Sequence, residues 1–138
     1  MSEIRTDYLQ KCIDTLQKSY DLLKTAEEGS VEYEVYRNSL VKGFELSLEQ
    51  SGKLLKKKIT PYFASKKAAD TLSFKDIFRH ALKYSLITEE ETKRWLRYRD
   101  NRNNTAHDYG QAFARETISL VKDFLADIEH LKEVIDNA

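Results

Sequence analysis

Helix-breaking residues are scarce in this chain, and this scarcity limits the folds that it can adopt. Its 138 residues contain one Pro and four Gly, whereas Lys, Glu, Leu and Ala, which favour helices, are frequent. The sequence therefore predicts an all-α protein. The length is that of one domain with a core of its own, so we expect a single helical domain over residues 1–138.

Two long helices are expected in the first half of the chain. Apolar residues recur at spacings of three and four over residues 2–25 and again over residues 31–59. Ser30 is the expected N-cap of the second helix, and Pro61 should stop it, because the residue before a proline is pushed out of the helical region. Since the loop between them is short, the two helices should pack antiparallel.

Three further helices are expected in the second half. Pairs with the spacing of N-terminal caps indicate where these helices begin: Ser73 with Asp76, Thr88 with Glu91, and Asp108 with Gln111. The first should run through Tyr84, the second toward Asn103, and the last carries the most regular apolar stripe of the chain. Residues 61–72 form a basic connector between the two halves.

Charge and composition exclude several classes of protein. The formal net charge is zero, so attraction to nucleic acid would have to come from a local patch. Cys12 is the single cysteine, which excludes a disulfide framework and a zinc cluster and fits a reducing cytoplasm. No apolar run approaches the roughly 18 residues of a membrane span. We expect a soluble cytoplasmic protein without a metal or another cofactor.

The segment from Arg102 to Tyr109 carries the chemistry. Arg102 can hold a phosphate through two parallel hydrogen bonds, and His107 can exchange a proton near neutral pH. On a regular helix these two side chains would lie about 140° apart, at about 100° per residue. Asn103 and Asn104 favour turns, however, so a helix that ends there would let both side chains face one side.

In that arrangement His107 would act as a general base. It would lie near the N-terminus of the last helix, whose positive end, together with Arg102, disfavours the imidazolium. A neutral imidazole could take the proton from a 2′-hydroxyl of RNA, which would then attack the neighbouring phosphate without a metal. The phenol of Tyr109 could bind a base or a phosphate, or accept a modification.

A purely structural interpretation of the same residues stays open. Arg102 could pair with Asp100 or with an acid on another helix, His107 could cap a helix end, and Tyr109 could be a half-buried tyrosine at a helix start. The spacing of so short a motif also arises by chance, so it does not decide between the two interpretations.

Beyond these residues, the chain resembles a known family. Arg102-x4-His107-x-Tyr109, with the polar Asn103 after the arginine, resembles the signature of HEPN domains. The stretch from Phe44 to Glu49, followed by Lys53-Leu54-Leu55-Lys56, is similar to the second helix of their nucleotidyltransferase substrate-binding branch. The order and spacing of Ser73–Ile87, Trp95 and the motif also match this branch. In one departure, Gly52 stands where the branch usually has Trp.

The resemblance implies an antiparallel up-down bundle of four to five helices that forms a homodimer, with two motifs lining one cleft. It also implies a partner, a minimal nucleotidyltransferase, that neutralises a ribonuclease toxin. Arg102 and His107 would be catalytic, and Tyr109 would be the site where the partner adds AMP. Some members of the branch are instead described only as substrate-binding subunits.

Two basic clusters could supply phosphate contacts, although such runs are usually solvated helix faces. One cluster holds four arginines, of which Arg99 and Arg102 lie closest to the motif: Arg94, Arg97, Arg99 and Arg102. The other consists of lysines at the end of the second helix and just after it: Lys53, Lys56, Lys57, Lys58, Lys66 and Lys67. We assign Arg99, Asn103 and Tyr109 to binding of the RNA or nucleotide ligand.

Other polar residues are expected to have ordinary roles. Glu45 and Glu49 lie one helical turn apart, a spacing that is typical of surface charges. His80 and His130 lack companions at metal-ligand spacing, so we expect surface or interface histidines.

Three functions fit these patterns. The first is a metal-independent endoribonuclease toxin of a HEPN/nucleotidyltransferase pair. The second is a noncatalytic nucleotide- or substrate-binding subunit of a nucleotidyltransferase complex. The third is a helical assembly protein in which the motif only ties helices together.

Overall fold

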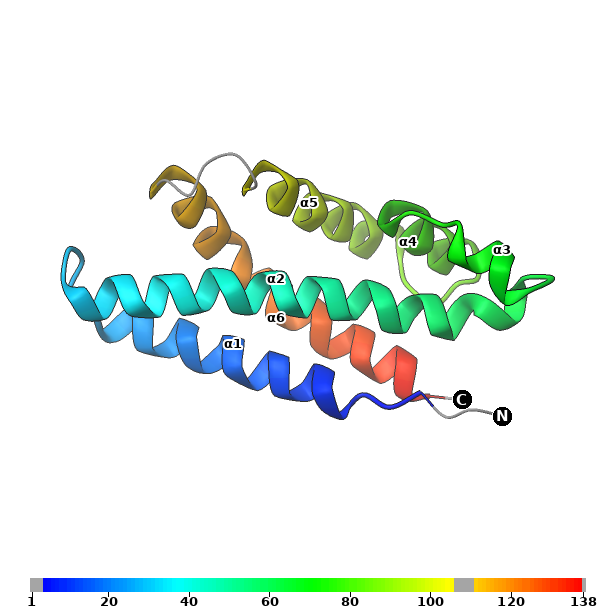
Figure 1. The fold of residues 1–138 in the computed structure, drawn as a ribbon, viewed down its shortest axis with the longest axis horizontal. Coiled ribbons are helices and arrows are strands. Elements are labelled where there is room, and N and C mark those ends of the chain that lie inside the picture. The colour runs from blue at the N-terminus through cyan, green and yellow to red at the C-terminus, as the bar shows by residue number, and fades with distance from the viewer. Residues whose placement is uncertain (1–3, 106–110, 138) are drawn as a thin grey trace.

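The chain folds into an all-helical bundle. A computed structural model describes residues 4–105 and 111–137, and no strand occurs among them (Figure 1). The elements are α1 (Asp7–Thr25), α2 (Val31–Ile59), the 3-10 turn η1 (Thr60–Tyr62), α3 (Lys66–Asp70), α4 (Phe74–Lys83), α5 (Glu89–Thr105) and α6 (Gln111–Asp136). The all-α prediction is confirmed. The expected connector over residues 61–72 contains most of η1 and the five-residue α3, which brings the described α-helices to six.

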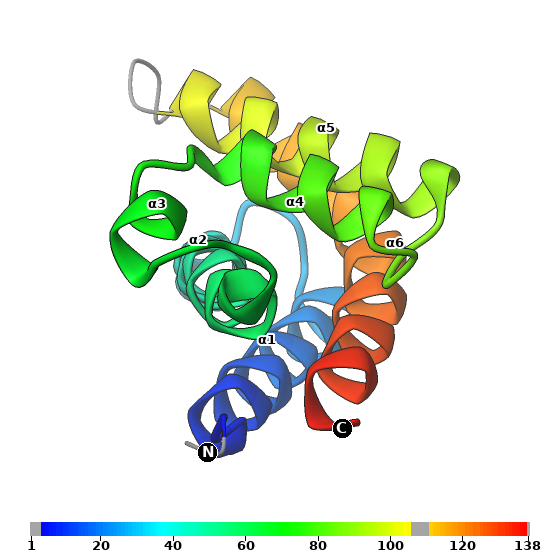
Figure 2. The ribbon, with the colours of Figure 1, turned by 90° about the vertical axis from the view of Figure 1, so that its right-hand side faces the viewer.

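Helix α2 is the centre of the bundle and contacts α1, α4, α5 and α6. Figure 1 shows α1 lying antiparallel along α2, as the short loop between them predicts. The view in Figure 2 shows α4 and α5 above α2, with α1 and α6 below and beside it. Thr6 donates a hydrogen bond of 2.6 Å to Asp136, so the start of α1 is tied to the end of α6.

Local signals set most helix ends. The Ser30 hydroxyl accepts a hydrogen bond from the backbone N–H of Tyr33, which makes it the N-cap of α2. α2 ends at Ile59, two residues before Pro61. The two capping boxes that open α4 and α5 are both formed, as the spacing predicts: Ser73 with Asp76, and Thr88 with Glu91. α1 begins at Asp7, later than the sequence predicts.

Aromatic side chains join four helices in the core. The ring of Phe44 on α2 lies 4.7 Å from that of Phe124 on α6, centroid to centroid. Trp95 on α5 stacks on Phe78 of α4 at 4.8 Å, and Tyr98 meets Phe124 edge-on at 5.0 Å. All five side chains are almost completely buried, so α5 is fixed on both α4 and α6.

A buried carboxylate also links α5 to α6. Asp127 accepts two hydrogen bonds of 2.8 Å from the guanidinium of Arg94 and one of 2.5 Å from the hydroxyl of Tyr98. Burial and the adjacent carboxylate raise the pKa of Tyr98 well above its usual value, so this phenol stays a donor. The three groups satisfy one another, which is the condition for stable burial of a charge.

Within the described ranges, none of the helices combines the length and the apolar composition that crossing a membrane requires.

Candidate functional site

Arg102 lies in the last turn of α5, which continues through Thr105. The backbone of Asn103 and Asn104 is therefore helical, so α5 continues past the asparagines at which the sequence would allow it to end. Asparagine costs a helix only about 0.7 kcal/mol relative to alanine, and packing readily overrides a preference of that size.

Part of the predicted motif lies outside the described residues. His107, Tyr109 and the Asp108 cap fall within 106–110, and the side chain of Asn103 is likewise not described. Their roles in catalysis, binding and modification therefore stay predictions. The described ends that flank them are Thr105 of α5 and Gln111 of α6.

Arg99 and Arg102 form a cationic pair on the last two turns of α5. Both side chains are partly buried. Burial and the neighbouring charge of Arg102 lower the pKa of Arg99, whereas Glu49 on α2 opposes this effect. An arginine remains protonated even when its pKa is lowered, so both partly buried side chains keep their positive charge. Such a pair attracts an anion such as a phosphodiester.

The guanidinium of Arg99 rests on an aromatic ring. Its central carbon lies 5.2 Å from the ring centroid of Phe74 on α4, within the range of a cation–π contact. The ring of Phe74 in turn packs on Phe78 with a centroid distance of 4.7 Å. These contacts orient the side chain of Arg99.

Phe74 occupies the space that Gly52 leaves on α2. A Cβ atom at Gly52 would lie 2.7 Å and 2.8 Å from two carbons of the Phe74 ring. The family resemblance implies a Trp at this position, and here a phenylalanine from another helix supplies an aromatic ring. Gly52 is thus a packing requirement, which the sequence marks only as a departure from the family pattern.

The four arginines of α5 have different roles. Arg94 is bound to Asp127, so its contribution is structural, and Arg97 is exposed. Only Arg99 and Arg102 lie at the end of the helix that leads into the motif. Asp100, one of the partners that the sequence suggests for Arg102, forms an ion pair of 2.6 Å with Lys75.

A buried polar contact near the motif was missed by sequence reasoning. The amide of Asn101, which is 3% exposed, donates a hydrogen bond of 3.0 Å to the hydroxyl of Thr117 on α6. This contact ties the end of α5 to the first part of α6. No sequence signal identifies it, because the two residues are sixteen positions apart on different helices.

The remaining polar candidates have structural surroundings. His80 packs against Phe63 with a centroid distance of 5.0 Å, and His130 binds the buried Glu91 that caps α5. Glu49 is exposed and Glu45 partly so. Among residues 4–105 and 111–137, no group of three or more His, Cys, Asp or Glu side chains is placed to hold a metal ion.

Solved structures identify the class of fold. A Haemophilus influenzae protein, described as having the fold of a substrate binding domain of a nucleotidyltransferase, matches with a TM-score of 0.81 and 24% identity. That match covers 96% of this chain and 100% of the other. A Thermus thermophilus protein matches with a TM-score of 0.72 and 24% identity, over 94% and 99% of the two chains.

The sequence comparisons define the family. The family model described as nucleotidyltransferase substrate binding protein like matches residues 5–137. A Haemophilus influenzae protein named Probable ribonuclease HepT is 32% identical over 103 residues, which cover 72% of this chain and 69% of that protein. The chain belongs to the nucleotidyltransferase substrate-binding-protein-like family, and its HEPN-like character is confirmed.

Proposed function

We propose that this protein is the ribonuclease toxin of a two-component HEPN/nucleotidyltransferase system and that it cleaves RNA without a metal ion. The observation that carries this proposal is the cationic pair of Arg99 and Arg102 on the last turns of α5, directly before His107 in the chain. The name of the Haemophilus relative supports the same activity.

The chemistry needs three groups. Arg102, assisted by Arg99, holds the phosphodiester by charge-assisted hydrogen bonds. The neutral imidazole of His107 takes the proton of the adjacent 2′-hydroxyl, and the 2′-oxygen attacks phosphorus. The bond from phosphorus to the 5′-oxygen breaks, that oxygen takes a proton from water, and the His107 imidazolium returns its proton to water. The products are a 2′,3′-cyclic phosphate and a 5′-hydroxyl, so no oxidant, reductant or cofactor is consumed.

The proposed assembly is a homodimer with a separate antitoxin. Two copies of the motif would line one cleft, and a minimal nucleotidyltransferase would neutralise the toxin by adding AMP to Tyr109. The adenylyl group would place bulk and negative charge beside Arg102, where the RNA phosphate binds. Family membership supports the nucleotidyltransferase partner, and the protein acts in the cytoplasm in this proposal.

A second candidate function is a noncatalytic subunit that binds nucleotide or substrate for a nucleotidyltransferase. The description of the Haemophilus structure favours it. In that case the arginine pair would bind the phosphates of a nucleotide, with no proton transfer by His107.

The test is cleavage of RNA by the purified protein, with chelator present, alongside growth arrest on expression. We expect wild type to cleave and to arrest growth, and His107→Ala and Arg102→Ala to do neither. Arg97→Ala is the matched control for the arginine, because Arg97 is exposed on the same helix. Circular dichroism and gel filtration establish that each variant is folded and has the oligomeric state of wild type.

The outcomes separate the candidates. Cleavage that only the two motif variants lose supports the ribonuclease. A folded wild type that cleaves nothing, but binds nucleotide in a manner lost in Arg102→Ala, supports the binding subunit. Variants that merely melt at lower temperature would favour the structural interpretation of the motif.

A further inference from the structure

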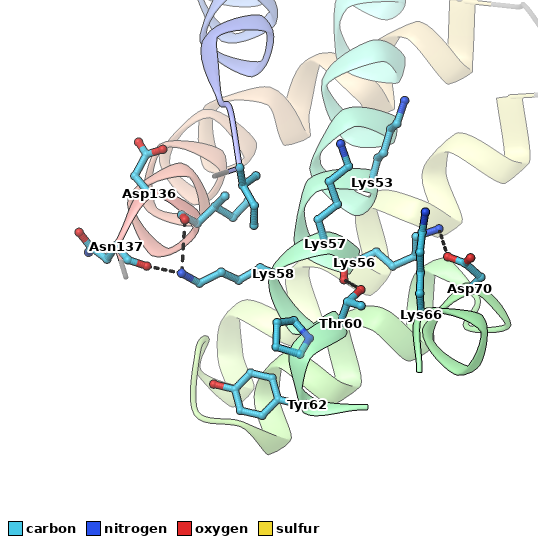
Figure 3. A pocket seen from close by; sticks show the side chains of 13 residues that line it. Lys53, Lys56, Lys57, Lys58, Thr60, Tyr62, Lys66, Asp70, Asp136 and Asn137 are labelled. Atoms are coloured by element: carbon cyan, nitrogen blue, oxygen red, sulfur yellow. Dashed lines mark hydrogen bonds and ion pairs between the residues drawn. The ribbon is translucent and has the colours of Figure 1, made fainter. Parts of the chain in front are cut away.

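A groove lined with lysines lies at the end of α2, and neither Arg99 nor Arg102 is among its lining residues (Figure 3). It is bounded by the end of α2, η1, α3 and the end of α6, and its volume is about 1330 Å³. Five lysines and two aspartates line it: Lys53, Lys56, Lys57, Lys58, Lys66, Asp70 and Asp136. This excess of positive charge stands out in a protein whose formal net charge is zero.

The aspartates are already engaged by other groups. Asp70 pairs with Lys56 at 3.0 Å, and Asp136 pairs with Lys132 at 3.0 Å and accepts from Thr6. Lys58 is also occupied, because it donates to the backbone carbonyls of Ile135 and Asn137.

Three lysines of the groove are left to bind a ligand. Lys53, Lys57 and Lys66 are exposed, and none has a hydrogen-bond or ion-pair partner among the described residues. Lys53 and Lys57 lie one turn apart on α2, about 6 Å along the axis, and extend in the same direction in Figure 3. They form a short row of unneutralised cations.

An aromatic ring is exposed in the same groove. Tyr62 stacks on Tyr84 with a centroid distance of 4.1 Å and an interplanar angle of 9°. One face of Tyr62 is therefore covered, yet the residue is 54% exposed, so the exposure comes from its edge and its other face. A flat ring supported from behind by a second ring suits stacking of an unpaired base.

We propose that this groove binds single-stranded RNA, with Lys53, Lys57 and Lys66 on the backbone phosphates and a base stacked on Tyr62. Cations that follow the backbone, together with aromatic rings for the bases, are the combination that single-stranded nucleic acid requires. The inference rests on the proposed ribonuclease function, because it concerns the same RNA substrate.

Residues that contact the arginine pair and residues that line the groove follow one another along α2. Glu49, whose carboxylate raises the pKa of Arg99, lies one turn before Lys53. Gly52 faces the ring of Phe74, on which Arg99 rests. Lys53 and Lys57 lie further along α2, toward η1. In this proposal an RNA strand whose phosphate is held at Arg102 continues along α2 into the groove, where it adds affinity but no chemistry.

The test measures binding of a fluorescein-labelled oligoadenylate of about 12 nucleotides, within the range of single-strand sites. Fluorescence anisotropy is recorded in the His107→Ala background so that RNA is not cut. Each phosphate contact contributes about 0.7 to the salt slope. Lys53→Gln/Lys57→Gln should thus lower that slope by about 1.4 and weaken binding about 25-fold at about 0.1 M salt.

Variants of Tyr62 test the stacking. Tyr62→Ala should weaken RNA binding at least about fivefold relative to the His107→Ala parent. Tyr62→Phe should bind within about twofold of that parent, since stacking requires the ring and not the hydroxyl. The matched charge control is Lys18→Gln/Lys122→Gln, two exposed lysines outside the groove. It should bind as its parent does.

Three results would overturn the inference. The first is binding by the two-lysine variant that equals that of the charge control. The second is RNA binding by Tyr62→Ala that equals that of its parent. The third is a loss in the variants that is as large with duplex RNA as with the single strand. Any of these would leave only a nonspecific basic surface or a contact for the nucleotidyltransferase. Failure of the proposed function is distinguishable, because then wild type cleaves no RNA whether or not the groove binds it.

Discussion

Replacing Gly52 by alanine tests the packing that orients Arg99. The added Cβ would lie 2.7 Å and 2.8 Å from two carbons of the Phe74 ring, about 1 Å closer than the roughly 3.5–4.0 Å of an unstrained carbon–carbon contact. The ring is partly exposed, but it packs on Phe78 with a centroid distance of 4.7 Å and carries Arg99 at 5.2 Å, so withdrawing it would weaken both contacts.

The expected effect on stability is the difference between two opposing contributions. Overpacking by one carbon costs about 1–3 kcal/mol. Alanine is favoured over glycine inside a helix by about 1 kcal/mol. Gly52→Ala should therefore lower the free energy of unfolding by about 1 kcal/mol. If Phe74 is first shortened to alanine, the overlap disappears, and Gly52→Ala should instead raise that free energy by about 1 kcal/mol.

Urea unfolding followed by circular dichroism measures this double-mutant cycle. Gly43→Ala is the matched control, since Gly43 is buried in the same helix but its added Cβ would lie 3.5 Å from the nearest atom, on Leu16. It should stabilise the protein. The reasoning is refuted if Gly52→Ala stabilises the wild type as much as it stabilises the Phe74→Ala variant, because the coupling between the two sites would then be zero.

Two further contacts of α5 give predictions. Asp127→Ala should cost about 3 kcal/mol in urea unfolding, because it leaves the buried Tyr98 and the partly exposed Arg94 without their acceptor, and a cost below about 1 kcal/mol would contradict that role. Burial disfavours the charged form of Glu91, but its hydrogen bonds from Thr88 and His130 outweigh that effect and lower its pKa below the usual value of 4.5. The stabilisation is therefore present above pH 4.5 and lost as the pH falls through the lower, folded pKa. Glu91→Gln should flatten the decline in stability in that acidic range, and an unchanged decline would show that other groups cause it.

The parts of the fold that are predicted best from the sequence depend on residues that are close together along the chain. Both bounds of α2 agree with the prediction, because Ser30 caps its start and Pro61 follows its end. The capping boxes of α4 and α5 are likewise contained within four residues. The expectation that α5 runs toward Asn103 falls two residues short of its end at Thr105, because asparagine favours helix ends but only weakly.

The candidate site depends on contacts that no spacing reveals. The sequence presents Arg94 and Arg99 as members of one basic run. The residues that distinguish them are Asp127 on α6, which binds Arg94, and Phe74 on α4, which supports Arg99. Since both partners are far away in the sequence, only the packing of α4, α5 and α6 separates a structural arginine from one available to a phosphate.

Helix α5 is attached to α6 at three levels, and this arrangement bears on how the predicted site works. His130 binds the cap residue Glu91 at its start, Asp127 holds its middle, and Asn101 donates to Thr117 near its end. The last of these contacts joins the two helices that residues 106–110 connect. General acid–base catalysis requires that the base and the phosphate-binding group keep a fixed separation. With α5 fixed along its length, the position of Arg102 is set by the bundle, so the catalytic geometry would depend only on where the short connection from Thr105 to Gln111 carries His107.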